Sequence, residues 1–298
     1  MPCETETKRS VNLDRRSSDR SAGPFAINGL VSLQRVHCPE WHAAYQELVP
    51  AADEFLALYA RWGLGYPWPA DPLHCWQRPF EYPYVLHNLP PVKAPRRPVV
   101  VDVGSAVTFF SLCLARRGYL LRCTDPDPRM LQFWNRVRAC FAEEAEALSR
   151  WEYLISAPYV IPIDAAAADA LTCVSVLEHV EDPPRLLEEM LRIVKPGGTL
   201  ILTMDVSLES NLGVSAGHFN TLRDMLEKLC VPAYQAESVH PQDLIVWPAV
   251  PRGLVPAPWF PKKPQSWRAR LLSPLQKYRV SPTPERSTCL FVGTYTRA

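Results

Sequence analysis

The sequence is poor in glycine and carries no excess of either charge. Its 298 residues include 12 glycines, well below the usual share of roughly 7%. The 32 basic and 31 acidic side chains leave a formal net charge of +1. This balance excludes a whole-protein electrostatic attraction to nucleic acids or anionic membranes. Any such contact would have to come from a local patch.

Long apolar runs and paired cysteines are also missing. No window approaches the roughly 18 unbroken apolar residues that a membrane-spanning helix needs, and the first ten residues are polar. The nine cysteines form no C-x-x-C pair and no His-Cys cluster with zinc-ligand spacing. They are scattered singly through apolar stretches, which is typical of reduced core thiols. We therefore expect no metal, no membrane segment and a cytoplasmic protein.

Proline, by contrast, is abundant: 18 of the 31 prolines fall in two stretches, nine in residues 67–98 and nine in residues 248–284. Either these stretches are disordered or they are stiff, ordered loops. Both contain several aromatic residues, which favour burial. We therefore predict that residues 67–98 wrap over a surface as extended chain, and that the two segments close over a ligand.

The chain divides into three parts. Residues 1–24 are expected to be a flexible tail, residues 25–95 a helical and proline-rich cap, and residues 96–298 an α/β domain with a proline-rich basic insertion at 248–285. Apolar residues between 41 and 62 recur at helical spacing, and Pro50 should break this segment into two helices or open the second one.

From residue 98 onward, short apolar runs alternate with amphipathic segments. Strands are predicted at 99–103, 119–124, 153–156, 171–176, 199–204, 244–247 and 288–296, and helices at 109–117, 130–150, 184–194 and 218–230. This alternation is typical of a parallel sheet with helices on both faces.

Ligands of such sheets bind at the carboxyl ends of the strands. A tight turn containing Gly104 follows the first of these strands, and Asp125 follows the second. An acidic side chain about twenty residues past a glycine turn suits the two hydroxyls of a ribose. A dinucleotide loop would need three glycines, so a nicotinamide-dependent oxidoreductase is disfavoured.

Four segments in this order resemble class I S-adenosylmethionine-dependent methyltransferases of the small-molecule, type 11-like group: VVVDVGSAV, CTDPDPRML, ALTCVSVLEHVEDP and LRIVKPGGTLILT. The preceding RPFEYP, together with Phe109-Phe110, resembles a bacterial branch of that group. The resemblance covers roughly residues 76–247 and the last strand. It implies a Rossmann-like doubly wound, mostly parallel seven-stranded sheet with the last strand antiparallel, plus an N-terminal helical cap. It also implies methyl transfer from S-adenosylmethionine to the oxygen or nitrogen of a small molecule.

The resemblance implies a set of cofactor-binding residues that follow the strands: Asp102, Gly104, Ser105, Ala106, Asp125, Pro126, Ser156, Ala157, Ser175, Leu177 and Glu178. Two of them depart from the family pattern, because Ala106 replaces a usual glycine and Ser156 a frequent aspartate. These changes predict weaker or differently shaped cofactor binding. They also motivate an alternative, in which the chain is a non-catalytic protein of this fold that acts as a binding or regulatory partner.

Candidate catalytic and substrate residues are fewer. A hydroxyl or acidic-carbon acceptor needs a general base, and His179 and His218 each follow a predicted strand. His179 could equally brace the cofactor site, and His218 is better explained as a capping or surface residue. Tyr82 and Tyr84 are substrate or lid candidates, with core packing as the alternative. The basic, aromatic segment 252–279 is better explained as a packed excursion or lid than as a nucleic-acid site.

Overall fold

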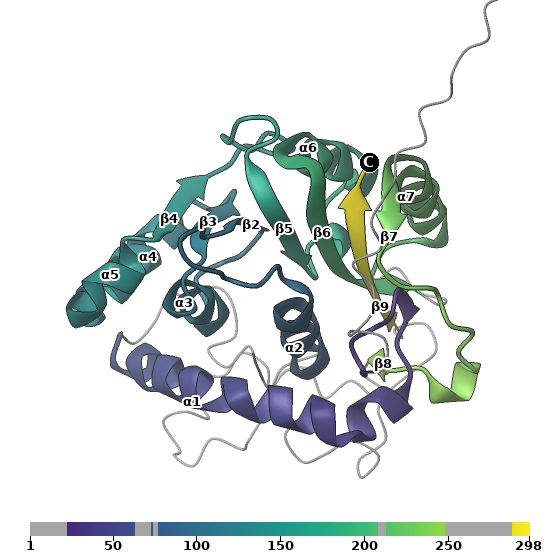
Figure 1. The fold of residues 1–298 in the computed structure, drawn as a ribbon, viewed down its shortest axis with the longest axis horizontal. Helices are drawn as coiled ribbons and strands as arrows, with labels where there is room; N and C mark the ends of the chain where they lie inside the picture. The colour runs from purple at the N-terminus through teal and green to yellow at the C-terminus, as the bar shows by residue number, and fades with distance from the viewer. Residues whose placement is uncertain (1–22, 63–72, 74–76, 208–212, 248–287) are drawn as a thin grey trace, which may run out of the picture.

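The structure is a computed structural model, and it describes residues 23–62, 73, 77–207, 213–247 and 288–298. The flexible tail expected at residues 1–24 falls almost entirely outside these residues, as does the basic segment 252–279. Figure 1 shows one twisted sheet with helices on both sides.

The sheet consists of nine strands in the described part of the chain. Their order is β1-β9-β6-β5-β2-β3-β4, with β7 and β8 also paired to β9. The strands are β1 (Gly29–Leu30), β2 (Val99–Val103), β3 (Leu120–Asp125), β4 (Trp151–Ile155), β5 (Ala168–Val174), β6 (Val194–Ser207), β7 (Cys230–Pro232), β8 (Val246–Trp247) and β9 (Thr288–Arg297).

Strands β2 to β6 are parallel to one another, and β9 runs antiparallel to β6. The predicted doubly wound, mostly parallel α/β fold with an antiparallel last strand is therefore confirmed. The three short strands β1, β7 and β8 all pair antiparallel with β9, which brings the sheet to nine strands where seven were expected.

The helices cover both faces of the sheet. They are α1 (Pro39–Trp62), α2 (Arg78–Asn88), α3 (Phe109–Arg116), α4 (Arg129–Cys140), α5 (Ala145–Leu148), α6 (Pro183–Ile193) and α7 (Ala216–Leu229). One apolar core joins α1, α2, α3 and α4 to one face, and a second joins α6 and α7 to the other (Figure 1). Successive residues of β2 point to opposite faces, so Val100 belongs to the first core and Val101 to the second.

The expected break at Pro50 does not occur, because α1 continues through it. A proline inside a helix costs about 3 kcal/mol. Trp41, Tyr45 and Leu48 before it and Phe55 after it are all buried in the same core. Since each buried aromatic or leucine side chain contributes about 1.5–3 kcal/mol, this shared face outweighs the cost of one proline.

Two further predictions of local structure were wrong. The segment 67–98 contains a helix, α2, although extended chain was expected there. Pro79 lies in its first turn, where the missing N–H costs no hydrogen bond, and the side chains from Pro79 to Val85 are buried. The single long helix expected at 130–150 is divided, since α4 ends at Cys140 and a 3₁₀ turn precedes the short α5.

Candidate functional site

The loop after β2 comes close to the loop after β5. Gly104 has a φ of +66°, and a Cβ atom there would lie 2.5 Å from Cγ2 of Val176. Both facts require glycine at this position. Ala106, two residues later, has a φ of +46°, so the alanine keeps the left-handed conformation that glycine adopts more easily. The departure from the family pattern therefore leaves the shape of this turn intact.

Asp125 ends β3 directly beside this turn. Its Oδ2 accepts a hydrogen bond from the Ala106 N–H at 3.3 Å, and its Oδ1 accepts one from the Asp127 N–H at 2.9 Å. The side chain is 7% exposed, and burial raises the pKa of its carboxyl group above the ordinary value. An ionised carboxylate has about four acceptor positions. Two remain, one for each hydroxyl of a ribose, and the geometry therefore fits the ribose of S-adenosylmethionine.

The end of β4 lies next to Asp125. The Ser156 N–H donates to the Asp125 carbonyl oxygen at 3.1 Å, and Ala157 forms an isolated bridge with Val160. Pro126 is exposed at the end of β3. Ser156 and Pro126, two of the residues predicted to form the adenosine end of the site, are thus neighbours of Asp125.

Asp102 lies within β2, one strand away, and is 5% exposed. Its Oδ1 accepts a hydrogen bond from the Thr172 hydroxyl at 2.7 Å. Burial raises the pKa of Asp102 to about 7, and the Thr172 hydrogen bond opposes that shift only in part. The folded protein therefore destabilises the charged form of the Asp102 carboxyl group relative to its neutral form.

The loop after β5 is joined to helix α2 by a buried carboxylate. Oε1 of Glu81, which is fully buried, accepts hydrogen bonds from the Ser175 hydroxyl at 2.5 Å and from the Thr203 hydroxyl at 2.6 Å. Its Oε2 pairs with Arg78. Burial alone would lower the pKa of Arg78, but the Glu81 carboxylate raises it above its ordinary value. Ser175 itself has a φ of +48°, a strained conformation that these contacts hold in place.

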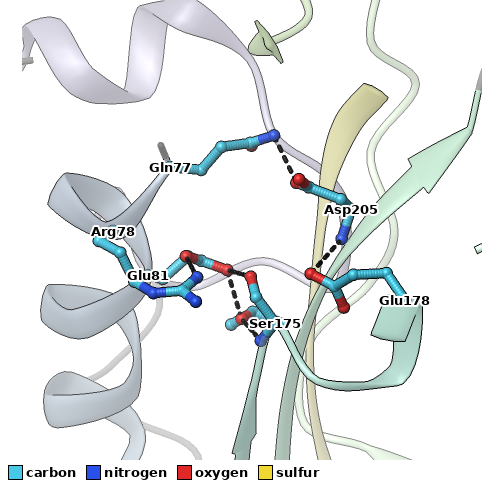
Figure 2. Close-up of polar contacts among 7 residues, drawn as sticks. Gln77, Arg78, Glu81, Ser175, Glu178 and Asp205 are labelled. Atoms are coloured by element: carbon cyan, nitrogen blue, oxygen red, sulfur yellow. Dashed lines mark hydrogen bonds and ion pairs between the residues drawn. The ribbon is translucent and has the colours of Figure 1, made fainter. Parts of the chain in front are cut away.

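A second group of polar side chains adjoins this one. The Gln77 Nε2 donates to Oδ1 of Asp205 at 2.6 Å, and the Asp205 N–H donates to Oε1 of Glu178 at 3.4 Å. Burial, followed by the charge of Glu81, raises the pKa of Asp205 to about 7. Burial, followed by the charge of Asp205, raises the pKa of Glu178 well above its ordinary value. Figure 2 shows the whole acidic cluster, defined here as Gln77, Arg78, Glu81, Ser175, Glu178, Thr203 and Asp205.

The sequence analysis found only Ser175 and Glu178 of this cluster. Leu177, also predicted, is fully buried between them and packs in the core beside β5. The signal for the α2 members was present in the segment RPFEYP, where two charged residues stand within an apolar and aromatic run. Asp205 directly follows the strand predicted at 199–204, so its position at a carboxyl end of the sheet was a signal that could have found it.

The two histidines lie in different settings. His179 ends the 3₁₀ turn Leu177–His179 beside the cluster, and burial, followed by the charge of Arg78, lowers its pKa below the ordinary value. It is therefore neutral near pH 7 and can accept a proton. His218 is exposed in the first turn of α7, where its backbone N–H donates to the Ser215 side chain. This position matches the surface or capping alternative, and no described contact links it to the cluster.

The two tyrosine side chains, Tyr82 and Tyr84, also lie in different surroundings. Tyr82 is 5% exposed, stacks on Phe110 with ring centroids 4.5 Å apart, and has a pKa raised to about 12 by burial. Tyr84 is fully buried, and its hydroxyl donates to the Ile27 carbonyl and contacts the Thr294 hydroxyl. Tyr84 therefore joins α2 to β9. It packs in the core, which is the alternative that the sequence offered to a substrate or lid role.

The described part of the chain holds no group of three or more His, Cys, Asp or Glu side chains placed to bind a metal ion. In the same part, no helix combines the length and the apolar character that crossing a bilayer requires.

Comparison with known proteins agrees with the motifs. Residues 101–202 match the family described as methyltransferase domain. A ubiquinone biosynthesis O-methyltransferase from Xanthomonas axonopodis pv. citri (strain 306) is 31% identical over 156 residues, which are 51% of this chain and 59% of that protein. An uncharacterized methyltransferase from Mycobacterium sp. (strain JLS) is 34% identical over 119 residues, covering 40% of this chain and 42% of that one. The chain thus spans about three-fifths of the length of the first of these relatives.

Among solved structures, geranyl diphosphate C-methyltransferase from Streptomyces coelicolor A3(2) is similar with a TM-score of 0.45 and 16% identity, covering 73% of this chain and 78% of that one. The family match spans β2 to β6 and contains the Gly104 turn, Asp125 and the loop after β5. The methyltransferase resemblance inferred from the four motifs agrees with this match, in which residues 101–202 are similar to the methyltransferase domain family.

Proposed function

We propose that this protein transfers the methyl group of S-adenosylmethionine to a small-molecule acceptor. The observation that carries the proposal is the arrangement around Asp125. Its carboxylate is oriented by two backbone N–H groups, retains two acceptor positions, and lies beside the left-handed turn at Gly104 and Ala106. The family match of residues 101–202 supports the same cofactor.

In this proposal, Asp125 binds the ribose hydroxyls, and Ser156 and Pro126 border the adenine. The turn at 104–106 and the start of the loop at Ser175 line the methionine end. S-adenosylmethionine supplies an electrophilic methyl group on a sulfonium. The chain's own contribution is to position the acceptor in line with that methyl group and to exclude water.

His179 is the candidate to accept a proton from a hydroxyl acceptor, since its imidazole is neutral near pH 7. The acidic cluster lies at the ends of β5 and β6, across β2 from Asp125. The acceptor is therefore expected on the β5 and β6 side of the cofactor.

Calorimetric titration of the full chain with S-adenosylmethionine and S-adenosylhomocysteine tests the cofactor assignment. The Asp125→Ala variant should weaken binding by about 1.5–3 kcal/mol, because it removes charged hydrogen-bond acceptors. Glu152→Ala is a matched control, since this carboxylate lies on the neighbouring strand β4 with 54% of its side chain exposed. An absence of heat with the wild type at millimolar cofactor would refute the proposal, and equal affinity for wild type and Asp125→Ala would show that the ribose site is misplaced.

A further inference from the structure

The acidic cluster contains more negative groups than its one described cation can balance. Arg78 pairs directly with Glu81, and its charge also lowers the pKa values of Glu178 and Asp205, so one described arginine faces three carboxyl groups. The nearby His179 does not supply a charge, because its pKa is lowered. Burying unpaired carboxylates is costly, and the cost is relieved when a cation binds between them.

Two buried acceptor atoms in the cluster make no hydrogen bond within the described part of the chain. They are Oε1 of Gln77 and Oε2 of Glu178. Gln77 is 2% exposed, and its amide nitrogen is bonded to Asp205, so its amide oxygen also lies at the cluster. Buried polar atoms are normally satisfied, and each unsatisfied one costs about 1–3 kcal/mol. The amide oxygen of Gln77 can only accept a hydrogen bond, and Oε2 of Glu178 accepts one when its carboxyl group is ionised, so the missing partner of the ionised cluster is a hydrogen-bond donor.

The position of these atoms assigns them to the acceptor and not to the cofactor's adenosine. The ribose site is at the end of β3, whereas Asp205 lies on β6. The sheet order places β2 and β5 between these strands, a separation of three strand spacings or about 14 Å. The sulfonium is joined to the ribose through one carbon. The acceptor attacks the methyl carbon from the side opposite the sulfur, and we place it on the β5 and β6 side of the cofactor, where the cluster lies.

We propose that the acidic cluster is the recognition site for the amino group of a methyl acceptor, which binds as an ammonium ion donating to Glu178 and to the amide oxygen of Gln77. This inference rests on the methyltransferase function proposed above and specifies its substrate class as amines.

The cluster also provides the proton transfer that an amine requires. An ammonium nitrogen has no lone pair, so it first gives one proton to a carboxylate, for which Asp205, with a pKa raised to about 7, is suited. The nitrogen lone pair then forms the bond to the methyl carbon. The carbon–sulfur bond breaks with its electron pair remaining on sulfur, which leaves a thioether and a methylated ammonium.

The test uses amine and alcohol probes that share a carbon skeleton: benzylamine with benzyl alcohol, tyramine with 4-(2-hydroxyethyl)phenol, and putrescine with 1,4-butanediol. Thermal shift of the full chain, with and without S-adenosylmethionine, measures binding, and the mass of the product measures methylation. We expect at least one amine to raise the melting temperature and to be methylated, and its paired alcohol to do neither. Binding or methylation of alcohols alone, or of no probe at all, overturns the inference.

Two substitutions assign the effect to the cluster. Glu178→Gln keeps the shape but removes the charge, and should raise the KM for the amine about ten- to hundredfold. The resemblance implies a cofactor-binding role for Glu178, whereas this inference assigns Glu178 to the acceptor, so the affinity for S-adenosylmethionine should change less than about twofold. Glu181→Gln is the matched control, because Glu181 is exposed three residues later and should leave both quantities unchanged.

The outcomes separate this inference from the proposed function. If calorimetry shows no binding of S-adenosylmethionine to the wild type, the methyltransferase proposal itself fails. If the cofactor binds and alcohols are the acceptors, only the inference about amines fails. If Glu178→Gln weakens cofactor binding as strongly as amine binding, the cluster serves the cofactor's own ammonium group and the inference is overturned.

Discussion

Replacing Asp102 with asparagine should change the pH dependence of stability of the ligand-free protein. The pKa of Asp102 is raised from its ordinary value of 3.8 to about 7 in the folded protein, mainly by burial. The folded state therefore binds this proton more tightly than the unfolded state does. As a result, the free energy of unfolding contributed by Asp102 falls as the pH rises from about 4 to about 7.

The size of the effect follows from the shift. A difference of about three pKa units corresponds to about 4 kcal/mol at 1.36 kcal/mol per unit. Asparagine cannot ionise and can still accept the Thr172 hydroxyl bond through its amide oxygen. Its new N–H₂ group adds a cost of about 1–3 kcal/mol if it is left without an acceptor, but that cost does not depend on pH.

Urea unfolding of wild type and Asp102→Asn at pH 4.5, 6, 7 and 8.5 measures this difference. Relative to the wild type, the variant should gain about 4 kcal/mol of stability between the lowest and the highest pH. Asp127→Asn is the control of opposite sign, because the hydrogen bonds that Arg129 donates to this half-buried carboxylate lower its pKa. The free energy of unfolding that is lost when Asp127 is replaced should become smaller as the pH falls. A difference between wild type and Asp102→Asn that stays constant with pH would refute the argument that burial holds Asp102 at a cost.

Three other substitutions test the structure by equilibrium unfolding. Ala106→Gly should stabilise the protein by up to about 1 kcal/mol, because glycine adopts a φ of +46° without strain, and a destabilised variant would contradict this backbone conformation. Glu81→Ala should destabilise it by about 3–5 kcal/mol by leaving Arg78 buried without its partner, and a cost below 1 kcal/mol would mean that the pair is hydrated. Tyr84→Phe should cost about 1–3 kcal/mol, since the Ile27 carbonyl loses its donor, and an unchanged stability would show that water replaces the hydroxyl.

Local patterns predicted most of the sheet. The runs at 99–103 and 171–174 are apolar because their strands are covered on both faces, and this pattern is visible without any knowledge of the neighbours. The order of turns and acidic residues after these strands likewise predicted that Asp125 lies beside the turn at Gly104 and Ala106, as the structure shows. Predictions failed where packing outweighed a local preference, as at Pro50 in α1 and in the proline-containing helix α2.

The acidic cluster depends on contacts that no local pattern encodes. Glu81 reaches Ser175 across 94 residues and Thr203 across 122, and Gln77 reaches Asp205 across 128. The sequence alone shows that these side chains exist, but not that one helix brings them to the ends of β5 and β6.

The sequence by itself determined where most of the strands and helices lie along the chain and that an acidic residue closes β3, because each depends on neighbours in the chain. Only the tertiary structure decided which carboxylates are buried together and which of their atoms lack a partner. Desolvation and electrostatic interaction depend on distance through space, so the raised pKa values of Asp102, Glu178 and Asp205 arise only in the folded chain, where α2 packs against the sheet.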